Sequence, residues 1–259
     1  MPEQKTATVH FGANRIATEV FECLSDHMIK VLLTTSTKTI SRQEYVKDFR
    51  PTMVASDKLG LLQGLIEPLL KDHEALDRFQ HIVLSEHALL GPIDDMLTKK
   101  TMFPKAKRRV QNIERAFSDR TLRLHLAIAP QAQCWTALLA DDDFTPGSKT
   151  DTMPVHSWAD LAARVANACP EAEITVWDFE RPEEIMLPFL ADLLEIDIEL
   201  IDDRTRANLQ DRACQPLKNA KLLSKIVQLE EGLQMRMDAQ YELDLNTIDA
   251  MPNVSLICS

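Results

Sequence analysis

Two short segments of this 259-residue chain carry side chains that could do chemistry. The first is a turn, in which Gly12 ends an apolar run and Arg15 and Thr18 follow at the start of an amphipathic segment. The first N–H groups of a helix lack backbone partners and carry partial positive charge, so a glycine turn leading into a helix can bind phosphate. The same residues also suit an ordinary strand-to-helix turn, in which Glu19 complements the helix dipole.

The second segment is Ser85, Glu86 and His87, which follow the apolar run "HIVL". Ligands of α/β proteins bind at the carboxyl ends of the strands, and a carboxylate or an imidazole held there could take a proton from a hydroxyl group. Glu86 and His87 are therefore the candidate catalytic residues. The alternative is that Ser85 caps a turn and the other two side chains are solvated.

The hydrophobic pattern predicts the elements that must position these segments. We expect strands at Ala7 to Phe11, near Ile29 to Thr34, and at "HIVLS", "LRLHLAIA" and "EITVWDF". We expect helices at Ala17 to about Asp26, Ser56 to Phe79, "KAKRRVQNIERAF", "AQCWTALLADD", Trp158 to Ala168 and Pro182 to Leu194, with a loop at "DDDFTPGSKTDTMP". This alternation predicts a doubly wound parallel α/β sheet of about five strands flanked by helices.

The apolar spacing from Leu217 to about Leu243 predicts a further helix, which packs on the main domain or on a partner. We therefore expect an α/β domain over residues 1–200 and a helical C-terminal extension over residues 201–259, packed on that domain.

Composition excludes several classes of function. A formal net charge of -11 argues against a nucleic acid or an anionic membrane as partner. The five cysteines are scattered without a CxxC pair, and the N-terminus lacks an apolar leader, so we expect a cytoplasmic protein with reduced thiols. Neither Asp141 to Asp143 nor the strand histidines His10, His81 and His125 have the spacing of a metal site, so no metal is expected.

Several segments together resemble the bacterial sulfotransferase-like P-loop family. "VHFGANRIATEVFECL" is similar to that family's first strand, Gly turn and helix, and "IVLSEHALLGP" resembles its third strand with the Ser-Glu and Leu-Gly that follow. "LRLHLAIA" resembles the next strand, and "WADLAARVANACPEAEITVWDFE" the helix, Pro, strand and Trp-Asp-Phe-Glu run. The resemblance covers about Thr8 to Leu194 and rests on the order and spacing of these segments.

The resemblance implies a P-loop fold and transfer of a sulfuryl group from 3′-phosphoadenosine 5′-phosphosulfate to an unknown hydroxyl or amine acceptor, without a metal. It implies that Gly12, Asn14, Arg15 and Thr18 hold the phosphosulfate end of the donor and that Glu86 or His87 is the base. For the donor's 3′-phosphate the family has an Arg and a Ser, where this chain has Ala129 and Ala137. Thr136, one residue out of register with that Ser, is the remaining candidate for binding the donor at this position.

The departures from the family pattern favour a rival reading. In the turn, Ile16 and Glu19 replace hydroxyl residues and Ala17 replaces a glycine, and all three changes weaken anion binding. Ala129 and Ala137 remove the side chains for the 3′-phosphate. A catalytically silent protein of this fold could act as a binding or scaffold module, using the helix from Leu217 to Leu243 as its interaction surface. A kinase or ATPase is a weaker alternative because the turn lacks G-x-x-x-x-G-K-[ST]. The basic run Lys99 to Arg109 could attract an anionic acceptor or form a solvated helix face.

Overall fold

The computed structural model describes residues 5–12, 18, 21–22, 24–25, 28, 32, 34–51, 79–91, 101–139, 155–211 and 230–258. The strands are β1 (Thr6–Gly12), β2 (Thr37–Ile40), β3 (His81–Ser85), β4 (Thr121–Ile128), β5 (Glu173–Asp178) and β6 (Val254–Ile257). The helices are α3 (Arg42–Glu44), α7 (Ala106–Ala116), α8 (Gln131–Leu139), α9 (Trp158–Ala168), α10 (Pro182–Leu194) and α12 (Glu231–Asp249). A π-helix, η1 (Tyr45–Phe49), two 3-10 helices, η3 (His87–Leu90) and η5 (Ile198–Leu200), and a helix over 203–211 complete the described elements.

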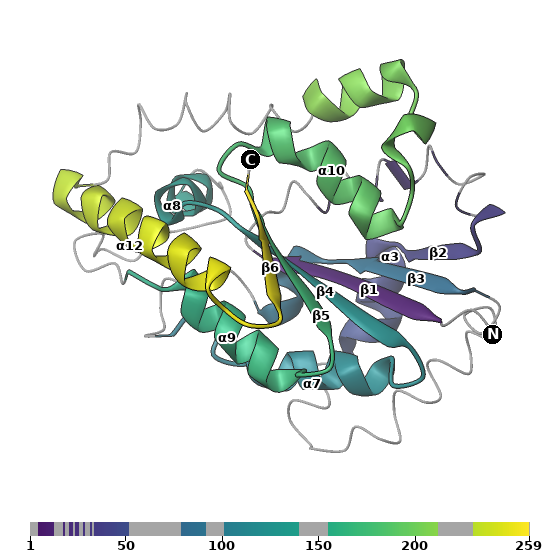
Figure 1. Ribbon diagram of the computed structural model, residues 1–259, viewed down its shortest axis with the longest axis horizontal. Coiled ribbons are helices and arrows are strands. Elements are labelled where there is room, and N and C mark those ends of the chain that lie inside the picture. The colour runs from purple at the N-terminus through teal and green to yellow at the C-terminus, as the bar shows by residue number, and fades with distance from the viewer. Residues whose placement is uncertain are drawn as a thin grey trace.

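The six strands form one sheet in the order β2-β3-β1-β4-β5-β6, and every pairing is parallel (Figure 1). β1 lies between β3 and β4, so that His10 is level with Ser85 on one side and with His125 on the other. The carboxyl ends of all strands therefore lie along one edge of the sheet, where a parallel α/β protein places its ligands.

Helices cover both faces of the sheet (Figure 1). α9 packs against α7 and α12 on one face, and α10 lies on the opposite face, where it contacts β1 and β5. Local signals fix these helices: Ser157 caps α9 by accepting a hydrogen bond from the Asp160 N–H at 3.0 Å, and Pro182 begins α10 with two acidic residues in its first turn. No helix in the described part of the chain is both long and apolar enough to cross a bilayer.

The structure confirms the α/β class, the parallel sheet and most of the predicted elements. The predicted bounds of β3, α9 and α10 agree with the observed bounds to the residue. The predicted helix at 56–79 and the loop at 141–154 fall almost wholly outside the described residues.

The predicted strand near Ile29 to Thr34 is wrong, because Leu32 and Thr34 are helical and the second strand is Thr37–Ile40. A short apolar run suits a buried helix as well as a strand, and the alternating "TKTI" that follows it was the better strand signal. The structure also contains a sixth strand, β6, which follows the predicted C-terminal helix and joins the edge of the sheet beside β5. Its four residues are too short for periodicity to identify.

Candidate functional site at the carboxyl edge of the sheet

The connections between strands reverse direction at β1. The chain leaves β1 for β2 on one side, whereas β3 connects to β4 on the other side and β4 continues to β5 in that same direction. Such a switch point opens a crevice at the carboxyl ends of the strands. Gly12 ends β1 there, and the backbone N–H of Glu86, just after β3, donates to the carbonyl of His10 at 3.0 Å.

The structure brings one predicted donor-binding residue to the predicted base. Thr18 and His87 are 69 residues apart in sequence, yet the His87 backbone N–H donates to the Thr18 hydroxyl at 3.2 Å. Thr18 is 1% exposed, so its hydroxyl is part of the packed wall of this edge. The two segments that sequence reasoning singled out therefore meet at the switch point.

The Glu86 carboxylate is buried and held from three directions. Its Oε1 accepts the Ala88 backbone N–H at 2.9 Å and lies 3.3 Å from His87 Nδ1, while Oε2 lies 3.8 Å from Arg42 Nε. The side chain of Glu86 is 3% exposed and that of His87 is 17% exposed. An incoming substrate would therefore reach His87 more easily than the carboxylate behind it.

Two further side chains, Tyr45 and Arg109, border the site. Burial, followed by the charge of Glu86, raises the pKa of Tyr45 to about 12, so that this phenol is a hydrogen-bond donor and not a base at neutral pH. Arg109 of α7 donates to the carbonyl of Leu89 at 2.9 Å and thus holds the 3-10 helix that follows Glu86. The guanidinium of Arg109 supports the backbone of the site.

Gly12 is required by the sheet itself. Its φ is +138°, and a Cβ at this position would lie 2.1 Å from the carbonyl oxygen of Ala127 in β4. A side chain here would push β1 away from β4. The glycine is therefore explained by the close approach of two strands, without a bound phosphate.

The other predicted donor-binding residues are described less fully. Asn14 and Arg15 lie outside the described residues, and Thr136 lies in α8, where only its backbone is described. Ala129, at the position of the family's arginine, is 7% exposed, and its carbonyl accepts the Trp158 Nε1–H at 2.9 Å. The neighbouring Gln131 is also engaged, because its Oε1 accepts the His156 N–H at 2.9 Å.

These contacts test how the donor nucleotide would fit. Thr18, Glu86 and His87 converge where its phosphosulfate end is expected. At the end of β4, the described residues Ala129 to Trp135 include no Arg or Lys for the 3′-phosphate. The described part of this edge therefore offers a hydroxyl, a carboxylate and an imidazole at the switch point, and no cation for a 3′-phosphate at the end of β4.

Sequence reasoning missed Arg42 and Tyr45. Both follow β2, and β2 was placed too early in the chain. The signal that could have found them is the capping box of Ser41 and Glu44, in which the Glu44 N–H donates to Ser41 Oγ at 3.2 Å and the Ser41 N–H donates to Glu44 Oε2 at 2.8 Å. It marks the end of β2 and puts Arg42 at the carboxyl edge.

The described residues contain no group of three or more His, Cys, Asp or Glu side chains that could hold a metal ion. His10, His81 and His125 are buried in the sheet, where each contacts neighbouring side chains. Burial raises the pKa of the Cys134 and Cys169 thiols to about 12, so neither is a thiolate nucleophile at neutral pH.

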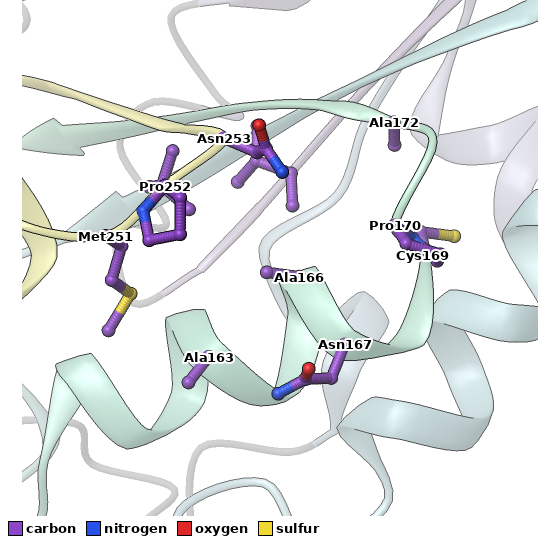
Figure 2. A pocket seen from close by; sticks show the side chains of 11 residues that line it. Ala163, Ala166, Asn167, Cys169, Pro170, Ala172, Met251, Pro252 and Asn253 are labelled. Carbon is purple, nitrogen blue, oxygen red and sulfur yellow. The ribbon is translucent and has the colours of Figure 1, made fainter.

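A small pocket of about 270 Å³ lies at the opposite edge of the sheet (Figure 2). Figure 2 shows Ala163, Ala166 and Asn167 of α9 facing the turn Met251 to Asn253 before β6. This pocket is lined mainly by small and apolar side chains and adjoins the amino ends of β5 and β6. It is therefore separate from the candidate site at the carboxyl edge.

Comparison with known protein families and with curated proteins finds no match to this chain.

Proposed function

We propose that this chain is a sulfotransferase-like α/β protein that binds 3′-phosphoadenosine 5′-phosphosulfate at the β1 switch point and transfers its sulfuryl group to a hydroxyl or amine acceptor. The observation that carries the proposal is the contact between Thr18 and His87, which joins the predicted donor turn to the predicted base. A parallel sheet whose connections reverse at β1 is compatible with this family's fold.

In this proposal the chain orients the acceptor and removes its proton. When bound, the nucleotide would supply the sulfuryl group for the acceptor hydroxyl or amine, with 3′-phosphoadenosine 5′-phosphate as the leaving group. His87 is the more accessible base, and Glu86 lies beside its Nδ1, where a carboxylate stabilises the imidazolium that proton transfer creates. The resemblance assigns Arg15 to the charged end of the donor, because a guanidinium is suited to pair with phosphate and sulfate groups.

Calorimetric titration with 3′-phosphoadenosine 5′-phosphate tests the donor site. We expect micromolar binding that Arg15→Ala weakens at least about tenfold, as the loss of charge-assisted hydrogen bonds requires. Arg236→Ala is the matched control, because Arg236 is an exposed arginine of α12. Absence of heat and of thermal stabilisation at millimolar ligand would reject the proposal.

The comparison of two ligands sharpens the same test. Adenosine 5′-monophosphate lacks only the 3′-phosphate, for which the end of β4 offers Ala129 in place of an arginine. One charge-assisted contact to the 3′-phosphate would favour the bisphosphate by roughly tenfold or more. Because the described residues at the end of β4 offer no such contact, we expect the two nucleotides to bind with affinities within about tenfold of each other. A much larger preference for the bisphosphate would locate a cation elsewhere and contradict our account of Ala129.

A second candidate function is a catalytically silent binding module of the same fold. It is favoured by the Glu86 carboxylate, which is already occupied by the Ala88 N–H and flanked by Arg42. α12 would then offer a partner surface, since its Met235 and Leu243 are 66% and 58% exposed. Nucleotide binding without release of the bisphosphate from the sulfated donor, across hydroxyl and amine acceptors, would support this second candidate.

A further inference from the structure

A pocket of about 580 Å³ opens at the carboxyl end of β2, and one of its lining residues, Arg42, lies 3.8 Å from Glu86. Phe21 and Glu22 line one side of it, and the segment from Ser41 to Val46, which follows β2, lines the other. Pockets for small molecules measure about 300 to 1,000 Å³, so its volume suits a small metabolite. Nothing in the sequence pattern pointed to it, because β2 was expected earlier in the chain.

Two opposite charges line this pocket. The Glu22 Oε1 accepts the backbone N–H of Arg42 at 2.8 Å, which fixes the carboxylate beside the start of the arginine side chain. The Arg42 side chain is 46% exposed, and its closest acidic contact is Glu86 at 3.8 Å. Its guanidinium makes no hydrogen bond with any residue in the described part of the chain, so its donors can serve a ligand.

The other described residues of the lining are uncharged. Thr39 and Gln43 add a hydroxyl and an amide, and Phe21 and Val46 add apolar surface. The described lining contains a single guanidinium and no lysine, which is too little positive charge for a nucleotide or another polyanion. A neutral polyol would leave the Glu22 carboxylate without a cation among the described residues and would offer Arg42 no acid beyond Glu86, which lies 3.8 Å away.

The geometry points to a binding site for a small hydroxylated zwitterion of the amino-acid class. Its carboxylate would pair with the Arg42 guanidinium and its ammonium with the Glu22 carboxylate. Because Arg42 also contacts Glu86, the pocket adjoins the base, and the bound hydroxyl or amine would be the acceptor. That role as acceptor rests on the proposed sulfuryl transfer, whereas binding of the zwitterion does not.

Four soluble probes separate the charge requirements. L-serine carries both charges and a hydroxyl, 3-hydroxypropionate lacks the ammonium, ethanolamine lacks the carboxylate, and glycerol lacks both. Ligand-observed NMR titration of the full chain should show saturable binding of L-serine, with each singly charged probe at least about tenfold weaker and glycerol weaker still.

Three variants assign the contacts. Glu22→Gln should abolish the preference for L-serine over 3-hydroxypropionate, and Arg42→Gln should abolish its preference over ethanolamine. Val46→Trp keeps both charges and fills the pocket from a half-exposed position, so it should prevent binding of L-serine in a chain that folds normally. Leu200→Trp is the matched control, since Leu200 is exposed and lies outside the pocket.

Equal binding of all four probes, no binding of L-serine at 100-fold the protein concentration and above, or binding unaffected by Val46→Trp would overturn the inference. A titration with 3′-phosphoadenosine 5′-phosphate on the same sample separates it from the proposed function. Nucleotide binding without L-serine binding rejects the pocket alone. Binding of L-serine without the nucleotide supports the zwitterion site and rejects sulfuryl transfer.

Discussion

The two faces of the central sheet are built from different chemistry. The face under α9 is apolar, with Val9 of β1 and Leu124 of β4 fully buried in the main core. The face under α10 buries His10, His125 and Thr8 on the same two strands. Because side chains alternate along a strand, adjacent residues of β1 and β4 belong to opposite faces. One face is stabilised by hydrophobic burial, and the other must satisfy every polar group that it buries.

Hydrogen-bonded pairs that cross from strand to strand satisfy part of the polar face. The Thr8 hydroxyl lies 2.9 Å from His81 Nε2, His10 Nδ1 lies 2.8 Å from Ser85 Oγ, and the indole N–H of Trp177 donates to His125 Nδ1 at 2.9 Å. These contacts leave His10 Nε2 and His125 Nε2 without hydrogen-bond partners among the described residues. The His10 pair also ties β1 to the residue before Glu86, so the polar face supports the candidate site.

α10 covers the polar face with one aromatic ring and two acids. Phe189 makes edge contacts with His10, at a centroid distance of 4.8 Å, and with Trp177 at 5.4 Å. Asp192 and Glu195 accept hydrogen bonds from Arg123 of β4 at 3.0 and 2.9 Å. The apolar face buries no histidine of the described strands, whereas the polar face buries three, so only the polar face depends on its histidines remaining neutral.

Acid should break the polar face first, and with the largest effect. Burial lowers the pKa of His10 well below its usual value, that of His81 to about 4 and that of His125 to about 3. The positive charge of Arg123 lowers the pKa of His81 and His125 further, and interaction with His125 lowers that of His10. Two carboxylates act in the opposite direction without reversing the shifts: Asp192 lies 3.6 Å from His125, and Glu195 lies 3.7 Å from His81.

The unfolded histidines titrate near pH 6.5, so the unfolded state binds more protons below that pH and stability falls as the pH falls toward 4. Well below pH 6.5 each histidine contributes about 1.4 kcal/mol per pH unit, or about 4 kcal/mol per unit for the three, and near pH 6.5 about half of that. Urea unfolding at pH 7, 6 and 5 measures this slope. His81→Gln should lower it by about one third, and equal stability at pH 7 and pH 5 would contradict the account.

The predictability of the two faces from sequence also differs. The apolar face could be predicted, because apolar residues recur at every second position in "LRLHLAIA" and "ITVW", and this period indicates strands with a buried face. The polar partners could not, since His10 and Ser85 are 75 residues apart and their contact depends on strand order. Periodicity identifies strands without saying which strands are neighbours.

The candidate site divides in the same way. The local motif "SEH" at a strand end was enough to select Glu86 and His87, and the Gly turn was enough to select Thr18. Arg42 and the pocket beside it could be predicted only from the correct end of β2. The apolar run around Leu32 suits a helix or a strand, so β2 was predicted too early in the chain. A site built by long-range packing is therefore only partly readable from local patterns.

Phe189→Ala should produce the next largest effect. The ring is fully buried and contacts side chains of β1, β4 and β5, so its removal leaves a cavity over the polar face. We expect a loss of about 3 to 5 kcal/mol in the free energy of unfolding, measured by urea denaturation. Leu200→Ala, at a residue that is 55% exposed, should change it by less than about 0.5 kcal/mol. A loss as small for Phe189→Ala would mean that polar pairs alone hold α10 in place.

Tyr241→Phe tests a polar contact that is buried on the otherwise apolar face, between Tyr241 and Asp178. The Tyr241 hydroxyl of α12 donates to the buried Asp178 carboxylate at the end of β5, and the Glu180 N–H donates to the same oxygen at 2.8 Å. Burial and the charge of Asp178 raise the pKa of Tyr241, so the phenol is a donor at all neutral pH values. Loss of this charged hydrogen bond should cost about 1.5 to 3 kcal/mol in thermal or urea unfolding. The exposed Glu242→Gln is the control, and a matching effect there would show that the hydroxyl contributes nothing specific.

The smallest effect should come from a pair of opposite substitutions on β1. Thr8→Val keeps the shape of the side chain and removes the hydroxyl that contacts His81 Nε2, so we expect a loss of about 1 kcal/mol in the free energy of unfolding.

Val9→Thr places a hydroxyl on the apolar face, where Val9 is fully buried, and should cost about 1 to 3 kcal/mol. The two residues are adjacent and nearly equal in volume, so packing changes little and the difference in cost reports the polarity of each face. If Thr8→Val were the more costly substitution, the hydroxyl pairs of the polar face would be stabilising beyond the ordinary hydrogen bond. Stability gained by Thr8→Val would instead show that burying the Thr8 hydroxyl costs the fold more than its contact with His81 returns.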